Sequence, residues 1–422
     1  MFKLTKRSFT ALMALVLVFS MAAIFGCSQA ENDNENDNDD QIFSTTPMVL
    51  GGLVLRADGT VWEIFRSGTP VGDDFDLTVA EQIKGLDNIV YITRNLESYF
   101  ALRYDGTVLA WGNNELGTLG DGTTINSTYP IQIEGLSDIV AISFSALHSL
   151  ALQSDGTVWS WGRNMVGQLG DGTTEDRSIP KPVEGLPTIT HVATAWGSFA
   201  LCENGSLWGW GFSFDVTPSS QFNMTLEPIE IPNLPPIKSL SVQESLILIC
   251  EKGQVYSFEG GTDLSFSQWT GGYNNVAVLR GFTWLSLCDQ GNVWSWDVHR
   301  HPTNFSIPPL IELREQLFES QNIVLVSMQG VIFLCEDGYV WRYRLSASSN
   351  APALEKIEEL SGIVALGSSF FGADVQFAFA DDGTLWAWAK DDPSSDPIWD
   401  IDIGLTNTPQ QVEFRGADGT GG

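Results

Sequence analysis

Short runs in which hydrophobic and polar residues alternate cover most of the chain. In the clearest example, residues 149–153 and 157–161 both alternate with a period of two, and the dipeptide Asp155-Gly156 lies between them. An Asp-Gly pair between two such runs favours a tight primed turn, in which both central residues adopt positive φ. The pattern therefore predicts a β-hairpin whose strands each have one buried face.

The hairpin motif repeats along the chain. Eight copies, 38 to 50 residues apart, begin at Asp58, Asp105, Asp155, Asn204, Lys252, Gln290, Asp337 and Asp382. An apolar run such as 139–142 precedes the hairpin, and a proline-containing run such as 179–183, which suits only an edge strand, follows it. Each repeat therefore predicts four antiparallel strands.

A four-stranded sheet of this kind cannot bury both of its faces alone. The copies must therefore stack face to face, and radial stacking of such sheets gives a propeller. We predict an all-β fold, a β-propeller of four-stranded antiparallel blades, with eight blades by hairpin count and seven as the alternative.

Two repeats carry a longer motif. Residues 111–124 and 161–174 both read W-G-x-N-x-x-G-x-L-G-D-G-T-T, and residues 148–152 read H-S-L-A-L. With the Glu-Gly-Leu sequences that begin at Glu134 and Glu184, these motifs resemble the regulator of chromosome condensation repeat family. The resemblance covers residues 42–414, but the motif degenerates after Trp210-Gly211.

The resemblance implies a binding function. The protein that gives the family its name acts in the nucleus as an exchange factor for a small GTPase and binds chromatin. Bacterial members that are more similar in setting are secreted propellers, including inhibitors of β-lactamase, which bind proteins through one propeller face.

The N-terminus differs in composition from the repeats. Residues 1–26 combine a basic start with an uncharged apolar run that is short for a membrane span, which is typical of a secretory signal peptide. Cys27 follows Gly26 in a sequence that resembles a bacterial lipobox, although Phe25 replaces the usual small residue. We therefore expect lipid attachment at Cys27, with an ordinary signal peptide as the alternative.

Composition divides the rest of the chain. Residues 27–41 contain six acidic residues and no large apolar one, so they predict a disordered tether behind the lipidated cysteine. Residues 42–414 form the predicted propeller, and residues 415–422 form a tail. These features place the protein outside the cytoplasm, anchored by lipid to a membrane of the bacterial cell envelope.

The charge balance narrows the range of partners. The chain has 21 Lys and Arg against 52 Asp and Glu, a net charge of −31. Such a surface repels nucleic acid and anionic lipid headgroups, so we expect no nucleic-acid partner and no membrane contact beyond the anchor. We expect a monomer with a protein partner.

Cysteines and histidines are the first candidates for chemistry. Cys202, Cys250, Cys288 and Cys335 each stand three residues before a turn glycine, so they occupy equivalent positions on successive blades. We expect such positions to be farther apart than the ~7 Å between Cα atoms that a disulfide allows, and predict free thiols.

No catalytic motif accompanies the histidines. His148 lies on a repeat strand and predicts a structural hydrogen bond, whereas His299 and His301 fall in a predicted loop. The common hydrolase, nucleotide-binding and zinc-protease motifs are absent from the sequence. We predict no catalytic residue, no metal and no cofactor.

Tryptophans are the other rich class, with 15 in the chain. Those in phase with the repeat predict packing between blades, whereas the out-of-phase Trp196, Trp269, Trp284 and Trp399 are candidates for an exposed binding surface. We predict that a propeller face binds another protein, as an adhesin, inhibitor or scaffold. The alternative is binding of carbohydrate or cell-wall fragments through exposed Trp, and a propeller lyase or hydrolase is the third hypothesis.

Overall fold

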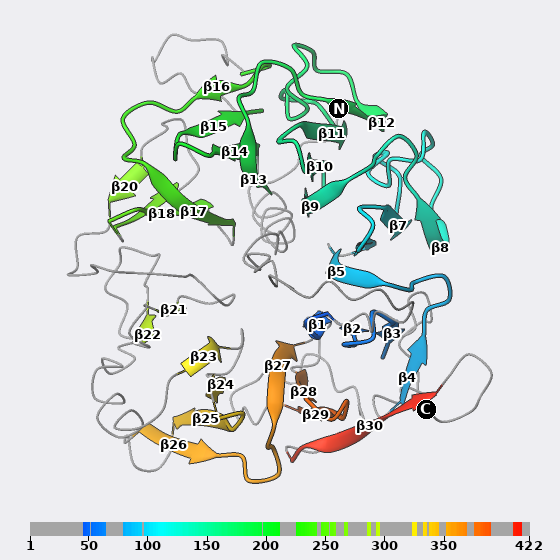
Figure 1. Ribbon diagram of the computed structural model, residues 1–422, viewed down its shortest axis with the longest axis vertical. Helices are drawn as coiled ribbons and strands as arrows, with labels where there is room; N and C mark the ends of the chain where they lie inside the picture. Colours follow the sequence, from blue (N-terminus) through cyan, green and yellow to red (C-terminus); the bar gives the residue numbers. More distant parts are fainter. Residues whose placement is uncertain are drawn as a thin grey trace, which may run out of the picture. The chain divides into compact units, whose positions relative to one another are not determined.

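The residues form β-strands joined by turns and loops (Figure 1). The computed structural model describes residues 45–50, 52–64, 79–94, 97–195, 197–211, 225–242, 246–252, 254–258, 266–268, 285–287, 293–295, 323–326, 332–335, 337–345, 352–368, 375–389 and 408–415. Within these ranges there is no helix of the length and apolar character that a membrane crossing requires.

The described strands form seven sheets, one of which joins the first and the last four strands. Within these sheets the strands fall into eight antiparallel groups, called blades 1 to 8 in chain order. Blade 1 contains β1 (Met48–Leu50), β2 (Leu53–Leu55), β3 (Val61–Glu63) and β4 (Val79–Gln82). Blade 2 contains β5 (Ile89–Arg94), β6 (Ser98–Arg103), β7 (Val108–Gly112) and β8 (Ser127–Gln132). Blade 3 contains β9 (Ile139–Phe144), β10 (His148–Gln153), β11 (Val158–Gly162) and β12 (Arg177–Pro182).

The later blades follow the same order. Blade 4 contains β13 (Ile189–Thr194), β14 (Ser198–Cys202), β15 (Leu207–Trp210) and β16 (Ile229–Glu230). Blade 5 contains β17 (Ile237–Val242), β18 (Leu246–Cys250), β19 (Val255–Phe258) and β20 (Phe266–Gln268), and blade 6 contains β21 (Leu285–Leu287) and β22 (Val293–Ser295). Blade 7 contains β23 (Ile323–Val326), β24 (Ile332–Cys335), β25 (Val340–Leu345) and β26 (Pro352–Lys356). Blade 8 contains β27 (Ile363–Ser368), β28 (Val375–Ala380), β29 (Leu385–Ala389) and β30 (Gln410–Arg415).

This arrangement confirms the predicted fold class, an all-β propeller built from four-stranded antiparallel blades. Among the described residues, the eight groups of strands match the eight hairpins of the sequence, with the first and last groups joined in one sheet. The described residues fall into two compact units: one runs from Ile92 and ends before Val276, and the other contains those up to Tyr91 and those from Val276 on. The first unit contains blades 2 to 5 apart from the first residues of β5, and the second contains blades 1, 6, 7 and 8.

The hairpin turn differs in detail from the sequence prediction. Gly156 has a φ of 90°, but Asp155 does not adopt positive φ. Gly156 N–H donates to the carbonyl of Gln153, and Gln153 N–H donates to the carbonyl of Thr157, so the loop has three residues with one left-handed glycine. The prediction of a primed two-residue turn was wrong, because the Asp155 carboxylate accepts the Thr157 N–H at 2.9 Å and stabilises the three-residue loop instead. This backbone hydrogen bond also lowers the pKa of Asp155.

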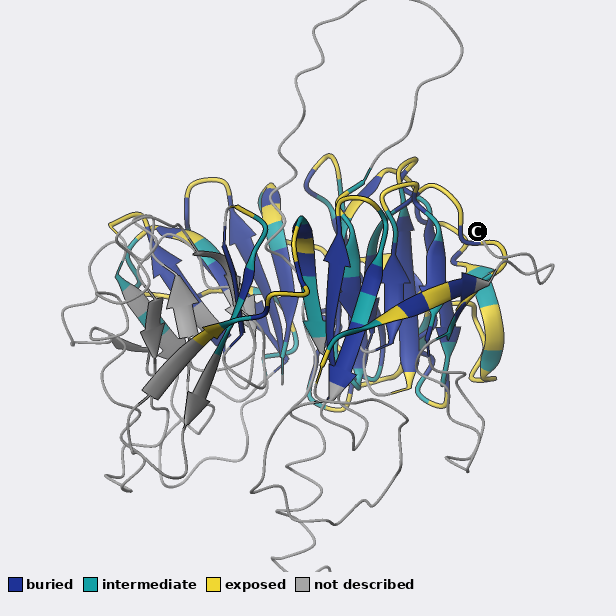
Figure 2. Cartoon of the chain, turned by 90° about the horizontal axis from the view of Figure 1, so that it is seen from below, coloured by how far each residue is buried: buried dark blue, intermediate teal, exposed yellow. Residues whose placement is uncertain are grey.

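Packing between neighbouring blades supplies the core. In the first unit, Leu150 and Val158 of blade 3 pack in one cluster with Val192 and Trp210 of blade 4. Exposed residues gather in the connections at the strand ends, and buried ones fill the strands (Figure 2). The repeat-phased Trp161 and Trp210 are fully buried, which confirms their predicted role in packing. The proline-containing β12 is the edge strand of blade 3, also as predicted.

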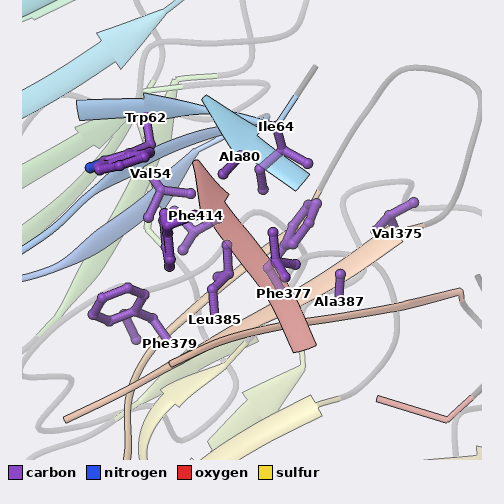
Figure 3. Packing of buried hydrophobic residues seen from close by; sticks show 13 residues of the cluster. Val54, Trp62, Ile64, Ala80, Val375, Phe377, Phe379, Leu385, Ala387 and Phe414 are labelled. Carbon is purple, nitrogen blue, oxygen red and sulfur yellow. The ribbon is translucent and has the colours of Figure 1, made fainter. Parts of the chain in front are cut away.

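Within the second unit, the first and last blades are joined in one sheet. Strand β30 pairs antiparallel with β29 and then pairs in parallel with β4, where Phe414 lies opposite Ala80. Phe414 contacts Trp62 edge to face, with ring centroids 5.0 Å apart. Figure 3 shows Phe414 among apolar side chains of both blades, including Val54 and Leu385. One strand therefore completes blade 8 and extends blade 1.

Candidate functional site

Two long loops, 113–126 in blade 2 and 163–176 in blade 3, join the third strand to the fourth. A buried asparagine organises each of them. Asn114 donates through Nδ2 to Asp121 at 3.0 Å and accepts through Oδ1 from Leu119 N–H at 2.9 Å. Asn164 repeats both bonds, with Asp171 at 3.2 Å and Leu169 N–H at 2.9 Å. Because both amides are saturated by the loop itself, the loops hold one conformation without help from a ligand.

The carboxylate in each loop closes a turn with the threonine that follows it. Thr123 N–H donates to Asp121 at 2.9 Å, and Thr173 N–H donates to Asp171 at 3.1 Å. Burial of Asp171 raises its pKa, but hydrogen bonds from Thr173, the positive charge of Arg177 and a hydrogen bond from Asn164 outweigh this effect and leave the pKa below the usual value. Asp171 is therefore held as an anion.

The two loops differ in the cation beside the carboxylate. In blade 3, Arg177 pairs with Asp171 and also donates to the carbonyl and hydroxyl oxygens of Ser160, both at 3.0 Å. In blade 2, Ser127 stands six residues after Asp121, where Arg177 stands after Asp171, and Ala110 replaces Ser160. Among the described residues, no lysine or arginine pairs with Asp121.

Each loop is also bound to the next blade. Trp161 of blade 3 donates its indole N–H to the carbonyl of Thr118 at 2.7 Å, and Trp210 of blade 4 donates to that of Gln168 at 2.8 Å. Gly122 N–H donates to the carbonyl of Ser178 at 2.9 Å. These contacts make the repeat-phased tryptophans part of the loop support, so a surface built on the loops is rigid.

His148 connects blade 3 to blade 4. Its ring is fully buried, with Nδ1 at 3.2 Å from Ser145 Oγ and Nε2 at 2.8 Å from Ser198 Oγ. Ser198 donates its hydroxyl proton to the carbonyl of Gln168, so it accepts a proton from Nε2. Burial lowers the pKa of His148 to about 3, which keeps the imidazole neutral. The predicted structural role of His148 is confirmed.

Large apolar side chains are exposed around the blade 2 loop. Ile125 in the loop is 72% exposed, Tyr129 in β8 is 72% exposed, and Ile179 in the facing strand β12 is 54% exposed. A Cβ at Gly122 would lie 3.5 Å from Ile179 Cγ1, so Ile179 lies against the loop that contains Asp121 and Ile125. We call Ile125, Tyr129 and Ile179 the loop patch.

The residues that the sequence singled out have different outcomes. The lipidation candidate Cys27 and the binding candidates Trp196, Trp269, Trp284 and Trp399 lie outside the described residues, as do Cys288, His299 and His301. No group of three or more His, Cys, Asp or Glu residues in the described ranges has the geometry of a metal site. The position of the predicted tryptophan surface therefore stays a prediction.

The cysteine prediction is confirmed where the structure describes it. Cys202, Cys250 and Cys335 are buried free thiols on blades 4, 5 and 7. Burial, and the nearby charge of Asp337, raise the pKa of Cys335 to about 11. The thiol is therefore protonated at neutral pH and behaves as a small apolar side chain.

Sequence reasoning missed the loop patch. Ile125 follows a Gly-rich motif rather than an alternating run, and Ile179 lies in a strand that the prolines had already marked as an edge. A signal was present, because the equivalent positions in the next repeats are the polar Glu175 and Glu227. Apolar residues where other copies of a repeat carry charge indicate a surface with a specific use.

The family is recognised at these blades. Residues 105–152 and 155–201 match the regulator of chromosome condensation (RCC1) repeat, and residues 139–168 match a second description of the same repeat. No curated protein sequence matches the chain.

Solved structures show weaker likenesses. The structure of Kap60 bound to yeast RCC1 (Prp20) is 18% identical and covers 72% of this chain and 83% of that chain, with a TM-score of 0.46. Prp20p from Saccharomyces cerevisiae, described with its binding to Gsp1p and histones, is 17% identical and covers 74% and 87%, with a TM-score of 0.47. The computationally designed Ika8 protein is 16% identical and covers 82% and 97%, with a TM-score of 0.48. The likeness to the repeat family rests on the matches within residues 105–201 and not on these structures.

Proposed function

We propose that this chain, which carries repeats of the regulator of chromosome condensation family, is a binding protein whose loops and blade edges recognise another protein. The observation that carries the proposal is the loop patch, in which Ile125 and Ile179 are exposed on a rigid, hydrogen-bonded support. Ile179 lies against Gly122, three residues before Ile125 in the same loop. Exposed apolar side chains gathered at one loop mark interaction surfaces, and a support that needs no reordering lowers the entropic cost of binding.

The setting that we propose is the bacterial cell envelope. A lipid on Cys27 would anchor the chain, and the acidic segment 27–41 would hold the blades away from the bilayer. The net charge of −31 supports a protein partner with a basic surface and disfavours nucleic acid.

The described residues do not favour the carbohydrate alternative. The nine tryptophans whose burial is known are buried or half-buried, and Trp161 and Trp210 are fully enclosed. Stacking of a sugar ring requires an open aromatic face. The alternative therefore depends on the other six: Trp294 and Trp296, and the predicted candidates Trp196, Trp269, Trp284 and Trp399, which lie outside the described ranges.

Affinity capture tests the proposal. The full-length tagged protein, solubilised in detergent with its cell envelope, is expected to retain a partner in stoichiometric amount. The double variant Ile125→Asp, Ile179→Asp should lose that partner, because it places charge in the apolar contact. Val364→Asp, at an exposed valine of blade 8, is the matched control and should retain it. Equal recovery by the wild type and the double variant, or no recovery at all, would contradict the proposal.

The anchor has its own test. Cys27→Ala should move the protein from the membrane fraction to the soluble fraction of a cell lysate. Retention of the variant in the membrane fraction after a high-salt wash would contradict lipid attachment at Cys27.

A further inference from the structure

We propose that the loop of blade 2 binds an arginine side chain of the protein partner, at the Asp121 carboxylate beside the loop patch. This inference rests on the proposed function and names the chemistry of the contact. Its basis is an internal comparison, because blade 3 contains the same loop with an arginine already in place.

Blade 3 shows how the loop framework holds a guanidinium group. Arg177 pairs with the Asp171 carboxylate, while its Nη2 donates at 3.0 Å to the backbone carbonyl of Ser160. A planar guanidinium can serve both acceptors at once, which a lysine ammonium on a flexible stem does less well. The framework therefore selects arginine through a carboxylate and a carbonyl at fixed positions.

Blade 2 has the same carboxylate in the same loop. Asn114 and Thr123 donate to Asp121 at 3.0 Å and 2.9 Å, as their counterparts do to Asp171. The Thr123 hydroxyl also donates to Asp121 Oδ2 at 2.8 Å, so a guanidinium would share with it the oxygen that Arg177 pairs with in blade 3. Ser127, which stands in place of Arg177, carries no charge and so offers Asp121 no ion pair. Asp121 belongs to the exposed part of the loop, so a side chain from outside can reach it.

The surroundings suit an arginine from a partner. Ile179 lies against the loop at Gly122, and Ile125 is two residues beyond Thr123, so apolar surface is available for the methylene stem of an arginine. Glu115 is exposed in the same loop and adds negative charge. The net charge of −31 would steer a basic partner toward the chain.

The test uses a short probe and the full-length protein in detergent. The probe is the capped tripeptide acetyl-Leu-Arg-Leu-amide, and binding is read from the isoleucine methyl signals in NMR spectra. The signals of Ile125 and Ile179 should shift with saturation, and the analogue with neutral citrulline in place of arginine should bind at least tenfold more weakly, because it lacks the charge.

Two variants locate the contact. Ser127→Arg gives blade 2 the internal arginine of blade 3, so it should weaken binding of the probe at least tenfold while the loop stays folded. Asp121→Asn should have the same effect, but it also removes a turn-forming carboxylate, which makes Ser127→Arg the decisive variant. Glu175→Gln, at an exposed carboxylate of the blade 3 loop, is the control and should change the affinity less than twofold.

The outcomes separate the inference from the proposed function. Equal binding of the arginine and citrulline probes, or unchanged binding to Ser127→Arg, would overturn the arginine contact. If Ser127→Arg still captures the envelope partner that Ile125→Asp, Ile179→Asp loses, protein binding stands and the arginine contact is wrong. If the wild type captures no partner, the proposed function fails, whatever the probe does.

Discussion

Blades 2 and 3 have the same backbone plan and the same loop framework, but they use their polar side chains differently. His148 of blade 3 and Ser98 of blade 2 both stand opposite the glycine that ends the third strand. Ser98 donates to the carbonyl of Asn113 within its own blade at 2.8 Å, whereas His148 reaches Ser198 of blade 4. Blade 3 also carries Arg177, where blade 2 has Ser127.

The difference shows which positions the framework requires. The asparagine, the glycines and the Asp-Gly-Thr-Thr turn are the same in both loops because they hold the backbone in place. The histidine and arginine positions are free to change, since each loop remains saturated without them. In blade 3 the histidine and the arginine add contacts within the protein, whereas in blade 2 Ser127 leaves the Asp121 carboxylate without a cation.

Among the differences between blades 2 and 3, the buried His148 should have the largest effect on folding stability, and acid reveals it. The pKa of His148 falls from about 6.5 in the unfolded chain to about 3 in the folded protein. The unfolded state therefore binds the proton first, and folding stability is lost as the pH falls from 6.5 toward 3. At 1.36 kcal/mol for each unit, this loss is on the order of 4 kcal/mol at pH 3. Urea unfolding followed by tryptophan fluorescence at a series of pH values measures it.

Substitution identifies the group responsible for the acid effect. His148→Gln removes the titrating ring, so its unfolding midpoint should depend less steeply on pH between 6.5 and 3 than that of the wild type. Blade 2 has Ser98 at this position and contributes no such dependence. Identical pH profiles for the variant and the wild type would show that His148 is not the source.

Alanine at the glycines that end the third strands should cause the next largest loss of stability, and the loss should be at least as large in blade 2 as in blade 3. Gly112 has a φ of +104°, and a Cβ there would lie 2.1 Å from the carbonyl oxygen of Glu97. Gly162 has a φ of +105°, with Leu147 O and His148 Cα at 2.9 Å. Each glycine-to-alanine change should cost about 3 kcal/mol of unfolding free energy, from backbone strain together with the clash.

A third glycine provides the control for that measurement. Gly135 also has positive φ, at +84°, but nothing lies within 4 Å of a Cβ there. Gly135→Ala should cost about 1 kcal/mol, which is the conformational strain alone. Equal losses at Gly112 and Gly135 would mean that the close approach to Glu97 has no energetic weight.

The repeat could be predicted from the sequence because the backbone geometry of each blade requires particular residues at fixed positions. The Asp-Gly turns, the alternating strands and the proline-containing edge strand each have a local physical cause, so the repeated four-stranded blade could be predicted from their spacing. The parallel pairing of β30 with β4 did not follow, because it joins residues about 330 positions apart and leaves no periodic signal.

The candidate site was harder to predict than the fold. Tryptophans out of phase with the repeat were the natural choice, since aromatic residues dominate binding surfaces. The loop patch instead consists of Ile125 and Ile179, whose exposure depends on how the loop of blade 2 lies against β12 of blade 3. The difference between Asp171, which pairs with Arg177, and Asp121, which accepts hydrogen bonds only from its own loop, is visible only in the side-chain contacts of the two loops.

Exchanging Arg177 and Ser127 between the two blades should change the free energy of unfolding by a smaller amount. Arg177→Ser removes the ion pair with Asp171 and the bonds to Ser160, and should lower the unfolding free energy by about 1.5 kcal/mol, because solvent screens part of the ion pair. Ser127→Arg should raise it by a smaller amount, since it also orders a long side chain. Urea unfolding at low and high salt measures both. A loss that does not shrink in 1 M salt would contradict the ionic contribution.

The smallest expected effect on stability concerns a tryptophan side chain that blades 3 and 4 share. In blade 3, Trp159 donates its indole N–H to the side chain of Gln153 at 3.0 Å. In blade 4, Cys202 stands at the position of Gln153, and the indole nitrogen of Trp208 is buried without a hydrogen-bond partner.

Cys202→Gln should therefore restore the missing acceptor and stabilise the protein by about 1 kcal/mol, which is the usual net contribution of a satisfied hydrogen bond. Gln153→Cys makes the reverse change in blade 3 and should cost a similar amount. Thermal unfolding of the two variants measures the pair. Cys202→Ser, which cannot reach the indole, separates this gain from the effect of removing the thiol. If Cys202→Gln destabilises the protein while Gln153→Cys is neutral, the space around Trp208, and not its unpaired nitrogen, decides which residue the position accepts.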